Sequence, residues 1–337
     1  MQQWQIPAFG IDSLTLVDRP DPIPAHLEPH HVLVRVHAVS LNYRDLMVVQ
    51  GIYNPRLHLP RIPCSDGAGE VLAAGSSVSQ WKPGDRVAGI FMQNWHDGYP
   101  SPTATKGALG GDIDGMLASH VILPASGLVR IPDHLTYAEA ATLPCAGVTA
   151  WNAVAAGSLK PGSTVLIQGT GGVSIFALQF AHLMGFRVLG ISSSNDKLDR
   201  AYSLGLGAGL NYRDNPNWDR WALDQTGGEG VDLVVEVGGP GTLERSLRAI
   251  GFGGVVVQIG ALTGSSGPVS IPLILHKWAR IQGIYVGSRT HFEQVNEAIT
   301  QSQLRPVLET LPWSKVREAF TRMEQGAHFG KLVVTVD

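Results

Sequence analysis

The sequence has little cysteine, little charge and no long hydrophobic run. Two cysteines, Cys64 and Cys145, among 337 residues cannot form a disulfide framework, so we expect a reducing compartment, the cytoplasm. No apolar run approaches the roughly 18 residues of a membrane span, and the opening residues lack the basic and apolar regions of a secretory signal. We therefore expect a cytoplasmic protein that does not bind a membrane.

Charge is scarce and nearly balanced. Charged residues make up 16% of the chain, against about 25% in an average protein, and the formal net charge is −3. The chain has no basic excess that could follow a phosphate backbone, so nucleic acid is not the expected partner. A surface poor in charge favours burial of part of that surface against another subunit.

Strand patterns dominate the first third of the chain. Residues 31–39 alternate between apolar and polar side chains, and residues 69–74 and 86–91 are short apolar runs bounded by glycine and proline. Such runs predict β-strands joined by turns. Residues 92–115 have little periodicity and many turn-forming residues, and they are too long for a simple connection. We interpret them as a functional loop.

From about residue 162 the pattern changes to strands that alternate with helices. These strands are apolar throughout, which is typical of a parallel sheet buried on both faces, and the alternation predicts a doubly wound fold. A last apolar run, residues 331–336, is expected to return to the β-rich region. The alternating strands are expected at residues 164–168, 187–191, 210–212, 232–237, 254–259 and 281–286.

A glycine-rich turn follows the first of these strands. Its residues are Gly169, Thr170, Gly171, Gly172 and Val173. Glycines allow close approach of the backbone to a pyrophosphate, and the N-terminus of the helix that follows favours an anion. Ser174 stands where the usual fingerprint has its third glycine. Because a strand precedes this turn and a helix follows it, we interpret it as a dinucleotide-binding turn rather than a packing feature.

The end of the second strand carries hydroxyls in place of a carboxylate. An NAD-selective site has an acidic residue there, about 20 positions after the glycine turn, but this chain has Ser192 and Ser193, followed by Lys197. Serine hydroxyls and a lysine can bind a 2′-phosphate, which a carboxylate would repel. We therefore expect NADPH, with NADH as the weaker candidate. A helix start capped by Ser194 or Asn195 is an alternative that is compatible with this role.

Six motifs distributed over the chain resemble those of one enzyme family. They are VSLNYRDLMVVQGIY (39–53), SDGAGEVLAAG (65–75), WKPGDRV (81–87), LPCAGVTAWNAV (143–154), VLIQGTGGVS (165–174) and FGKLVV (329–334). In this order and spacing they resemble the medium-chain dehydrogenase/reductase superfamily, and specifically its zinc-independent, quinone oxidoreductase-like branch. The resemblance covers essentially the whole chain and leaves the substrate open.

The resemblance implies an α/β protein with two domains. A GroES-like, β-rich catalytic domain would comprise residues 1–128 and 287–337. A doubly wound Rossmann domain that binds NAD(P) would comprise residues 129–286. In this family the last sheet strand, here residues 281–286, commonly pairs across a two-fold axis, so we expect a homodimer.

The resemblance also bears on metal binding. Zinc-dependent members hold their catalytic metal at three places, which in this chain are occupied by Asn42, by Ser65 with Asp66, and by Cys145. A catalytic zinc site needs about three protein ligands. One surviving thiol does not suffice, so the resemblance predicts an enzyme without catalytic zinc.

Roles for individual residues follow from the same resemblance. Asn42 and Tyr43 would face the nicotinamide and a small-molecule substrate, and Asp45 would brace their loop or simply cap a helix. Arg44 could bind a substrate anion, or it could pair with a neighbouring carboxylate. The residues implied in cofactor binding are Thr149, Gly169, Thr170, Gly171, Gly172, Val173, Ser192, Ser193, Lys197, Tyr212, Val237, Gly238, Ile259, Gly260, Tyr285 and Lys331. Lys331 would reach a cofactor phosphate, or it is a surface lysine. Thr149 would lie by the nicotinamide, or it is a buried threonine bonded to its own helix.

The expected activity is hydride transfer from NADPH to a quinone, an enone or a related carbonyl compound. Two alternatives remain, namely an alcohol or aldehyde dehydrogenase activity and a protein that binds NADPH without catalysis. A methyltransferase also has a glycine-rich first turn, but it usually has the acidic residue that Ser192 replaces. It would also leave the first and last segments of the chain unexplained.

Overall fold

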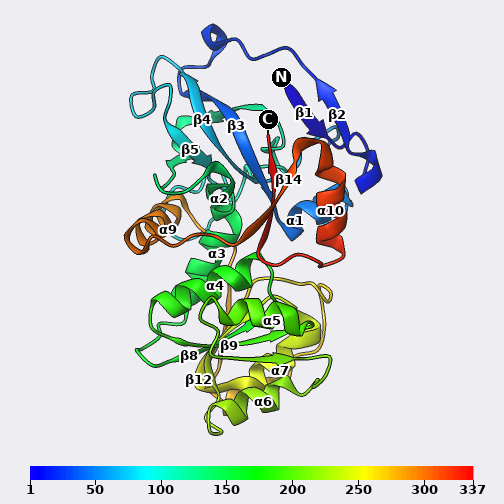
Figure 1. Ribbon diagram of the computed structural model, residues 1–337, viewed down its shortest axis with the longest axis vertical. Helices are drawn as coiled ribbons and strands as arrows, with labels where there is room; N and C mark the ends of the chain where they lie inside the picture. Colours follow the sequence, from blue (N-terminus) through cyan, green and yellow to red (C-terminus); the bar gives the residue numbers. More distant parts are fainter. Residues whose placement is uncertain (337) are drawn as a thin grey trace. The chain divides into compact units, whose positions relative to one another are not determined.

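The computed structural model describes residues 1–336 and divides into two compact units (Figure 1). The first unit comprises Met1–Val148 and Val286–Asp337, and the second comprises Thr149–Tyr285. Within residues 1–336 there is no helix that is both long and apolar enough to cross a membrane. Each unit has its own sheet and its own hydrophobic core.

A seven-stranded sheet forms the centre of the first unit. The strands follow the order β14-β15-β3-β4-β5-β7, and β6 also pairs with β3. The C-terminal strand β15 pairs antiparallel with β3, with Leu332 opposite Leu41, which confirms its expected return to the β-rich region. The strands are β3 (His31–Leu41), β4 (Asp66–Ala74), β5 (Arg86–Gly89), β6 (His120–Pro124), β7 (Leu128–Arg130), β14 (Leu308–Pro312) and β15 (Lys331–Thr335).

Smaller elements complete the first unit. Strands β1 (Gln2–Gln5) and β2 (Thr15–Asp18) form a separate antiparallel pair. Its α-helices are α1 (Tyr43–Val49), α2 (Tyr137–Ala140), α9 (Arg289–Ser302) and α10 (Val316–Glu324), and α3 (Val148–Ala156) begins at the boundary with the second unit.

Residues 129–148 lie in the first unit, whereas the sequence analysis assigned them to the second domain. Two contacts explain this placement. Strand β7 pairs with β5, and the ring of Tyr137 in α2 stacks on His37 of β3 with the ring centroids 4.4 Å apart. The chain therefore leaves the first unit only after these contacts are made.

A six-stranded parallel sheet forms the second unit, in the order β10-β9-β8-β11-β12-β13. The two halves run outward from β8 and β11, which is the strand order of a doubly wound dinucleotide-binding domain. This confirms the expected α/β fold class. The strands are β8 (Thr164–Gln168), β9 (Arg187–Ser192), β10 (Ala208–Asn211), β11 (Val231–Glu236), β12 (Ile250–Gln258) and β13 (Arg280–Gly283).

The helices of this unit connect successive strands and pack on the sheet (Figure 1). Leu166, Leu189, Val234 and Val256, from the four central strands, are fully or almost fully buried in one core. Such continuous burial is the reason why these strands lack a polar face. The helices are α4 (Gly172–Leu183), α5 (Asn195–Tyr202), α6 (Trp218–Gln225), α7 (Pro240–Ala249) and α8 (Ile271–His276).

Candidate active site and cofactor-binding turn

Asp45 joins two turns of the first unit. Its carboxylate, which is fully buried, accepts the backbone N–H of Asn42 at 2.8 Å and that of Ser65 at 3.3 Å. Asn42 lies between β3 and α1 as the N-cap of α1, while Ser65 precedes β4. Asp45 thus caps its own helix and also ties the two turns together, so both sequence interpretations of this residue describe part of its geometry.

Arg44 packs beside this junction. Its Nη1 donates to the Leu109 carbonyl oxygen at 2.6 Å and lies 3.3 Å from Asp45 Oδ1. The guanidinium lies over the rings of Tyr53 and Phe91, at 5.2 and 5.0 Å from their centroids. Pairing with a neighbouring carboxylate, one of the two interpretations from the sequence, therefore occurs in the structure.

Residues of the segment 92–115 contact the Arg44 guanidinium. Leu109 belongs to this segment, and a Cβ added at Gly111 would lie 2.2 Å from Arg44 Nη2. Asp112 holds the segment by accepting the backbone N–H groups of Gly107 and Ala108, at 3.0 and 3.2 Å. The segment expected to be a functional loop is therefore folded against the α1 region, and its function stays a prediction.

Five residues form what we call the polar cluster: Asn42, Ser65, Asp66, Cys145 and Lys331. The Lys331 ammonium donates to Asn42 Oδ1 and to the carbonyl oxygen of Leu41. Asn42 Nδ2 lies 3.4 Å from Ser65 Oγ, which donates to Asp66 Oδ1 at 2.7 Å. Asp66 Oδ2 accepts the backbone N–H of Cys145 at 3.0 Å, so four segments of the chain meet in one row of hydrogen bonds.

Burial controls the electrostatics of the polar cluster. It raises the pKa of the Asp66 carboxyl to about 6, although Lys331 and the Ser65 hydroxyl act to lower that pKa. Desolvation and the nearby Asp66 raise the pKa of the Cys145 thiol. At neutral pH Cys145 is therefore a neutral thiol rather than a thiolate, and the thiolate is the form that attacks a substrate.

The expected catalytic residues differ in exposure. Asn42 and Asp45 are buried, whereas Tyr43, on the first turn of α1, is 45% exposed. The Asp45 carboxylate accepts bonds from two backbone N–H groups and from the Arg44 guanidinium, whereas the Asn42 amide and the Tyr43 phenol carry hydrogens of the kind that can be donated to a carbonyl oxygen. Within residues 1–336 no group of three or more His, Cys, Asp or Glu residues could hold a metal ion.

The glycine turn of the second unit has the expected surroundings. It follows β8 and opens α4, and the Gly169 N–H donates to the Ile191 carbonyl of β9 at 2.7 Å. Ser174 is buried, and its hydroxyl donates to the Gln168 carbonyl oxygen at 2.6 Å. Ser174, in place of the third glycine, therefore links the first turn of α4 to the end of β8 by a hydrogen bond.

The residues expected near a 2′-phosphate lie at the ends of neighbouring strands. Ser192 ends β9, and its carbonyl oxygen accepts the Tyr212 N–H at 2.9 Å, just beyond β10. Ser194 is the N-cap of α5, because its hydroxyl accepts the Lys197 backbone N–H at 3.4 Å. The structure thus contains the predicted cap and also places Ser192, Lys197 and Tyr212 in one region of the second unit.

The sequence patterns do not single out Glu236 as a site residue. This fully buried carboxylate ends β11 and accepts bonds from the Gly238 and Gly239 N–H groups, at 2.8 and 2.9 Å, and from the Thr242 hydroxyl at 2.6 Å. Gln168 Nε2 donates to its other oxygen at 2.7 Å. Glu236 thereby fixes the turn that holds Val237 and Gly238, and the available signal was an acidic residue at the end of an apolar strand.

The remaining predicted cofactor residues lie at or near strand ends of the second unit. Ile259 follows β12, and its N–H donates to the Glu236 carbonyl oxygen at 2.9 Å. Gly260 is next to it, Tyr285 follows β13 and is 45% exposed, and Thr149 is buried at the start of this unit. Lys331 belongs to the first unit. The contacts of all these residues with a cofactor stay predictions.

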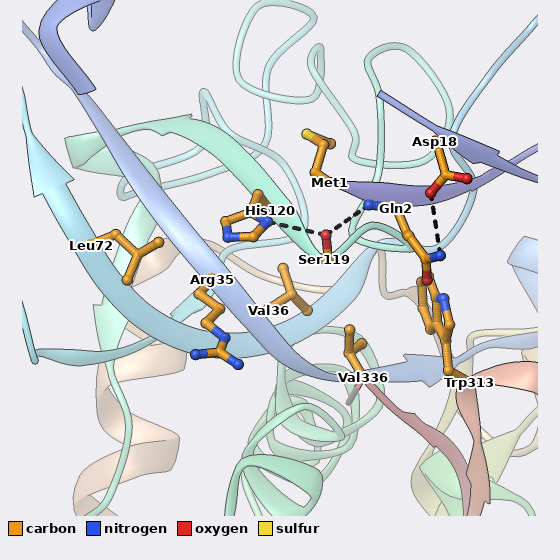
Figure 2. Close-up of a pocket in the computed structure, with 10 residues that line it drawn as sticks. All are labelled: Met1, Gln2, Asp18, Arg35, Val36, Leu72, Ser119, His120, Trp313 and Val336. Carbon is orange, nitrogen blue, oxygen red and sulfur yellow. Dashed lines mark hydrogen bonds between the residues drawn. The ribbon is translucent and has the colours of Figure 1, made fainter. Parts of the chain in front are cut away.

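A separate pocket of about 600 Å³ lies elsewhere in the first unit, around β1, β3 and β6 (Figure 2). In it the Ser119 hydroxyl accepts the Gln2 N–H at 3.0 Å and lies 3.0 Å from His120 Nδ1. Asp18 accepts a bond from the Gln2 side chain at 3.3 Å. None of the predicted site residues lines this pocket, so it is distinct from the polar cluster.

Two family models match the chain. Residues 28–133 match the alcohol dehydrogenase GroES-like domain, and residues 172–301 match the zinc-binding dehydrogenase domain. The Schizosaccharomyces pombe zinc-type alcohol dehydrogenase-like protein C1773.06c is 42% identical over 94% of this chain and 93% of its own length. The acryloyl-coenzyme A reductase of Metallosphaera sedula is 27% identical over 94% of each chain.

Solved structures are similar over the whole chain. A putative alcohol dehydrogenase from Sinorhizobium meliloti 1021 has a TM-score of 0.92 with 38% identity, covering 99% of this chain and 98% of its own. A crystal structure named NAD-dependent alcohol dehydrogenase has a TM-score of 0.90 with 31% identity, covering 100% of both chains. The likeness therefore extends through both units.

The pKa of Asp66 predicts how stability depends on pH. An aspartate in an unfolded chain titrates near 3.9, and Asp66 in the folded chain titrates at about 6, so folding favours its protonated form. Its stabilising contribution is present below about pH 4 and is lost as the pH rises through 6. We expect the free energy of unfolding of Asp66→Asn to rise relative to that of the wild type by roughly 1.5 kcal/mol between pH 5 and pH 8, because about half of the total difference of ~3 kcal/mol is already present at pH 5.

Urea unfolding at pH 5, 6, 7 and 8 measures this effect. The matched control is Asp133→Asn, because Asp133 is exposed, and its free energy of unfolding should follow the wild type at every pH. A constant difference between Asp66→Asn and the wild type across this range would show that burial does not hold the Asp66 proton.

Proposed function

Because the chain belongs to the medium-chain dehydrogenase/reductase superfamily, in its zinc-type alcohol dehydrogenase-like branch, we propose that it transfers a hydride from NADPH to an enone, a quinone or a related activated carbonyl compound without catalytic zinc. The chain is an NAD(P)H-dependent oxidoreductase. The proposal concerns its cofactor preference, its substrate class and the means by which it stabilises negative charge.

The polar cluster is the observation that carries the proposal. At the three places where the resemblance locates zinc ligands, the chain has an amide, a serine with a buried aspartate, and one thiol. An ammonium, that of Lys331, already bonds the first of these residues, Asn42. This donor set does not fit zinc, which needs about three thiolate, imidazole or carboxylate ligands in one tetrahedral site.

Without a metal, the oxygen of the substrate must receive hydrogen bonds as negative charge develops on it. The Asn42 amide and the Tyr43 phenol can supply such donors. An α,β-unsaturated carbonyl compound or a quinone suits these neutral donors, because hydride addition spreads the charge to an oxygen remote from the attacked carbon. A simple ketone would demand the stronger polarisation that a metal provides.

NADPH is the proposed cofactor on account of the ends of β9 and β10. Ser192 and Ser193 stand where an NAD-selective site has its carboxylate, and Lys197 lies on the first turn of α5. Hydroxyls and an ammonium form charge-assisted bonds with a phosphate. We also propose cofactor contacts through the glycine turn, and through Val237 and Gly238, which Glu236 holds.

The relatives support two substrate classes. Several are named alcohol dehydrogenase, while others are named acryloyl-coenzyme A reductase and crotonyl-CoA carboxylase/reductase. The latter names describe unsaturated thioesters, which are electron-poor alkenes of the kind proposed here. Alcohol or aldehyde dehydrogenase activity is the alternative, and NADPH binding without turnover is the other outcome that the assay distinguishes.

A homodimer joined at β13 is the proposed assembly. This strand is the edge of the parallel sheet, its four residues are exposed, and within residues 1–336 it pairs with β12 alone. Around it lie Phe252, Leu275 and Trp278, with exposed fractions of 78, 70 and 74%. An uncovered strand edge with large apolar neighbours favours pairing with a second copy.

The chemistry predicts the effects of two substitutions. Asn42→Ala and Tyr43→Phe should each lower kcat for enone reduction by about 10²–10³-fold, the usual cost of removing an oxyanion donor. The dissociation constant for NADPH should stay within twofold. NADPH oxidation is followed by absorbance with a panel of quinones, enones, enoyl thioesters, aldehydes and ketones, in the presence and absence of a chelator.

The control is Gln301→Ala, which removes an exposed amide on α9 and should retain wild-type kcat. Full activity of Tyr43→Phe across pH would leave Tyr43 with a packing role only. Loss of activity on chelation would contradict the zinc-free proposal, and preferential turnover of alcohols would favour the dehydrogenase alternative.

Lys197 provides a test of cofactor preference. A hydrogen bond to a charged group contributes about 1.5–3 kcal/mol, so Lys197→Ala should weaken NADPH binding roughly tenfold to a hundredfold and leave NADH binding nearly unchanged. Fluorescence titration with both cofactors measures this. Lys160→Ala, which changes an exposed lysine of the same unit, is the control. Equal losses for the two cofactors would exclude a 2′-phosphate site at Lys197.

The assembly is tested by a charge placed in the edge strand. Ile281→Arg, at a residue of β13 that is 41% exposed, should convert a particle of twice the 36.0 kDa chain mass into a monomer by light scattering. Ile23→Arg, in the first unit and 57% exposed, should not change the mass. A monomeric wild type, or a dimer that survives Ile281→Arg, contradicts an interface at β13.

A further inference from the structure

Lys331 is brought to the polar cluster by the C-terminal strand. It is the first residue of β15, it is 3% exposed, and the next residue, Leu332, lies opposite Leu41 of β3. A Cβ at the preceding Gly330 would lie 2.3 Å from the Val307 carbonyl oxygen, so only glycine allows this close approach. The lysine is therefore held tightly by backbone on both sides.

The hydrogen bonds of the Lys331 ammonium determine which end of the Asn42 amide faces β15. An ammonium can only donate hydrogen bonds, whereas the Asn42 amide has one accepting and one donating end of nearly equal size. Because Lys331 donates to Asn42 Oδ1, the opposite orientation would place the amide NH₂ against an ammonium. The lysine thus selects the orientation in which Oδ1 faces β15.

The contacts of the Asn42 NH₂ group favour the same orientation of the amide. Asn42 Nδ2 lies 3.4 Å from Ser65 Oγ, and the Ser65 hydroxyl donates to Asp66. Since its hydrogen is directed at Asp66, Ser65 offers only lone pairs to Asn42. Nδ2 therefore faces away from Lys331, toward Ser65 and toward the Asp66 carboxyl, whose pKa is lowered by a hydrogen bond from the Asn42 side chain.

We propose that Lys331 is a positioning residue that fixes the Asn42 amide with its NH₂ group on the side of Ser65 and Asp66, where the carbonyl oxygen of the substrate replaces one of these partners as the acceptor. This inference rests on the donor role of Asn42 in the proposed function. It differs from the role implied by the resemblance, in which Lys331 reaches a cofactor phosphate. The two roles predict different kinetic changes, because one concerns the reacting oxygen and the other concerns cofactor affinity.

The test is Lys331→Met, which keeps an unbranched side chain of similar length but removes the donor. We expect kcat for the best enone substrate to fall on the order of tenfold to a hundredfold, the effect of losing a hydrogen bond from a charged group. The dissociation constant for NADPH should stay within twofold. In an Asn42→Ala background the same substitution should change kcat by less than about twofold, because the group it orients is absent.

Two further variants complete the design. Lys331→Arg retains the ability to donate to both acceptors and should keep kcat within about fivefold of the wild type, so it also serves if Lys331→Met does not fold. Lys82→Met, which alters an exposed lysine of the same unit, should leave kcat and NADPH affinity unchanged. A folded Lys331→Arg that is as slow as the methionine variant would contradict the proposal.

Other outcomes separate this inference from the proposed function. Weaker NADPH binding with unchanged kcat would assign Lys331 to the cofactor phosphate and overturn the inference, as would equal losses of kcat in the Asn42 and Asn42→Ala backgrounds. If the wild type transfers no hydride to any acceptor, the proposed function fails. The interaction between Lys331 and Asn42 is then tested by urea unfolding of the two single variants and the double variant. Additive shifts in the midpoints of Lys331→Met and Asn42→Ala would overturn the pairing, and non-additive shifts would support it.

Discussion

The buried carboxylate of Asp45 is the constraint on which the candidate active site depends. A carboxylate removed from water must be surrounded by donors and opposite charge, and here the donors are the backbone N–H groups of Asn42 and Ser65, with Arg44 alongside. Antiparallel pairing places the end of β3 beside the start of β4, with Ser40 opposite Asp66. Asp45 then ties the two turns beyond this pairing, where Asn42, Ser65 and Asp66 form a row.

Side chains of opposite charge lie close together in the first unit. Arg44 lies against Asp45, and Lys331 lies within the electrostatic range of both Asp45 and Asp66. Two buried cations thereby offset two buried acids in a region of low dielectric, where an unpaired charge would be costly. The neutral Asn42 amide accepts a hydrogen bond from one of these cations, Lys331. The proposed function without zinc relies on neutral donors of this kind.

In the second unit, buried polar side chains also fix the backbone through hydrogen bonds. Glu236 holds two consecutive backbone N–H groups and a helix hydroxyl, and Ser174 bonds the end of its own strand. The glycine turn and the parallel strands were predictable because both follow from local patterns, namely glycine spacing and continuous apolar runs. The role of Glu236 was not predictable, since a single acidic residue carries no periodicity. The placement of residues 129–148 also depended on pairing with a strand about 40 residues earlier.

The sequence by itself determined the family, the α/β fold class, the strand order that a doubly wound domain requires, and the residue types at the three places where the resemblance locates zinc ligands. Only the tertiary structure decided which partners those residues have. Lys331 meets Leu41 and Asn42 across about 290 positions of chain, and Cys145 meets Asp66 across 79. Hydrogen bonds between such distant segments leave no trace in local spacing, because they are set by strand register and by the need to satisfy buried charge.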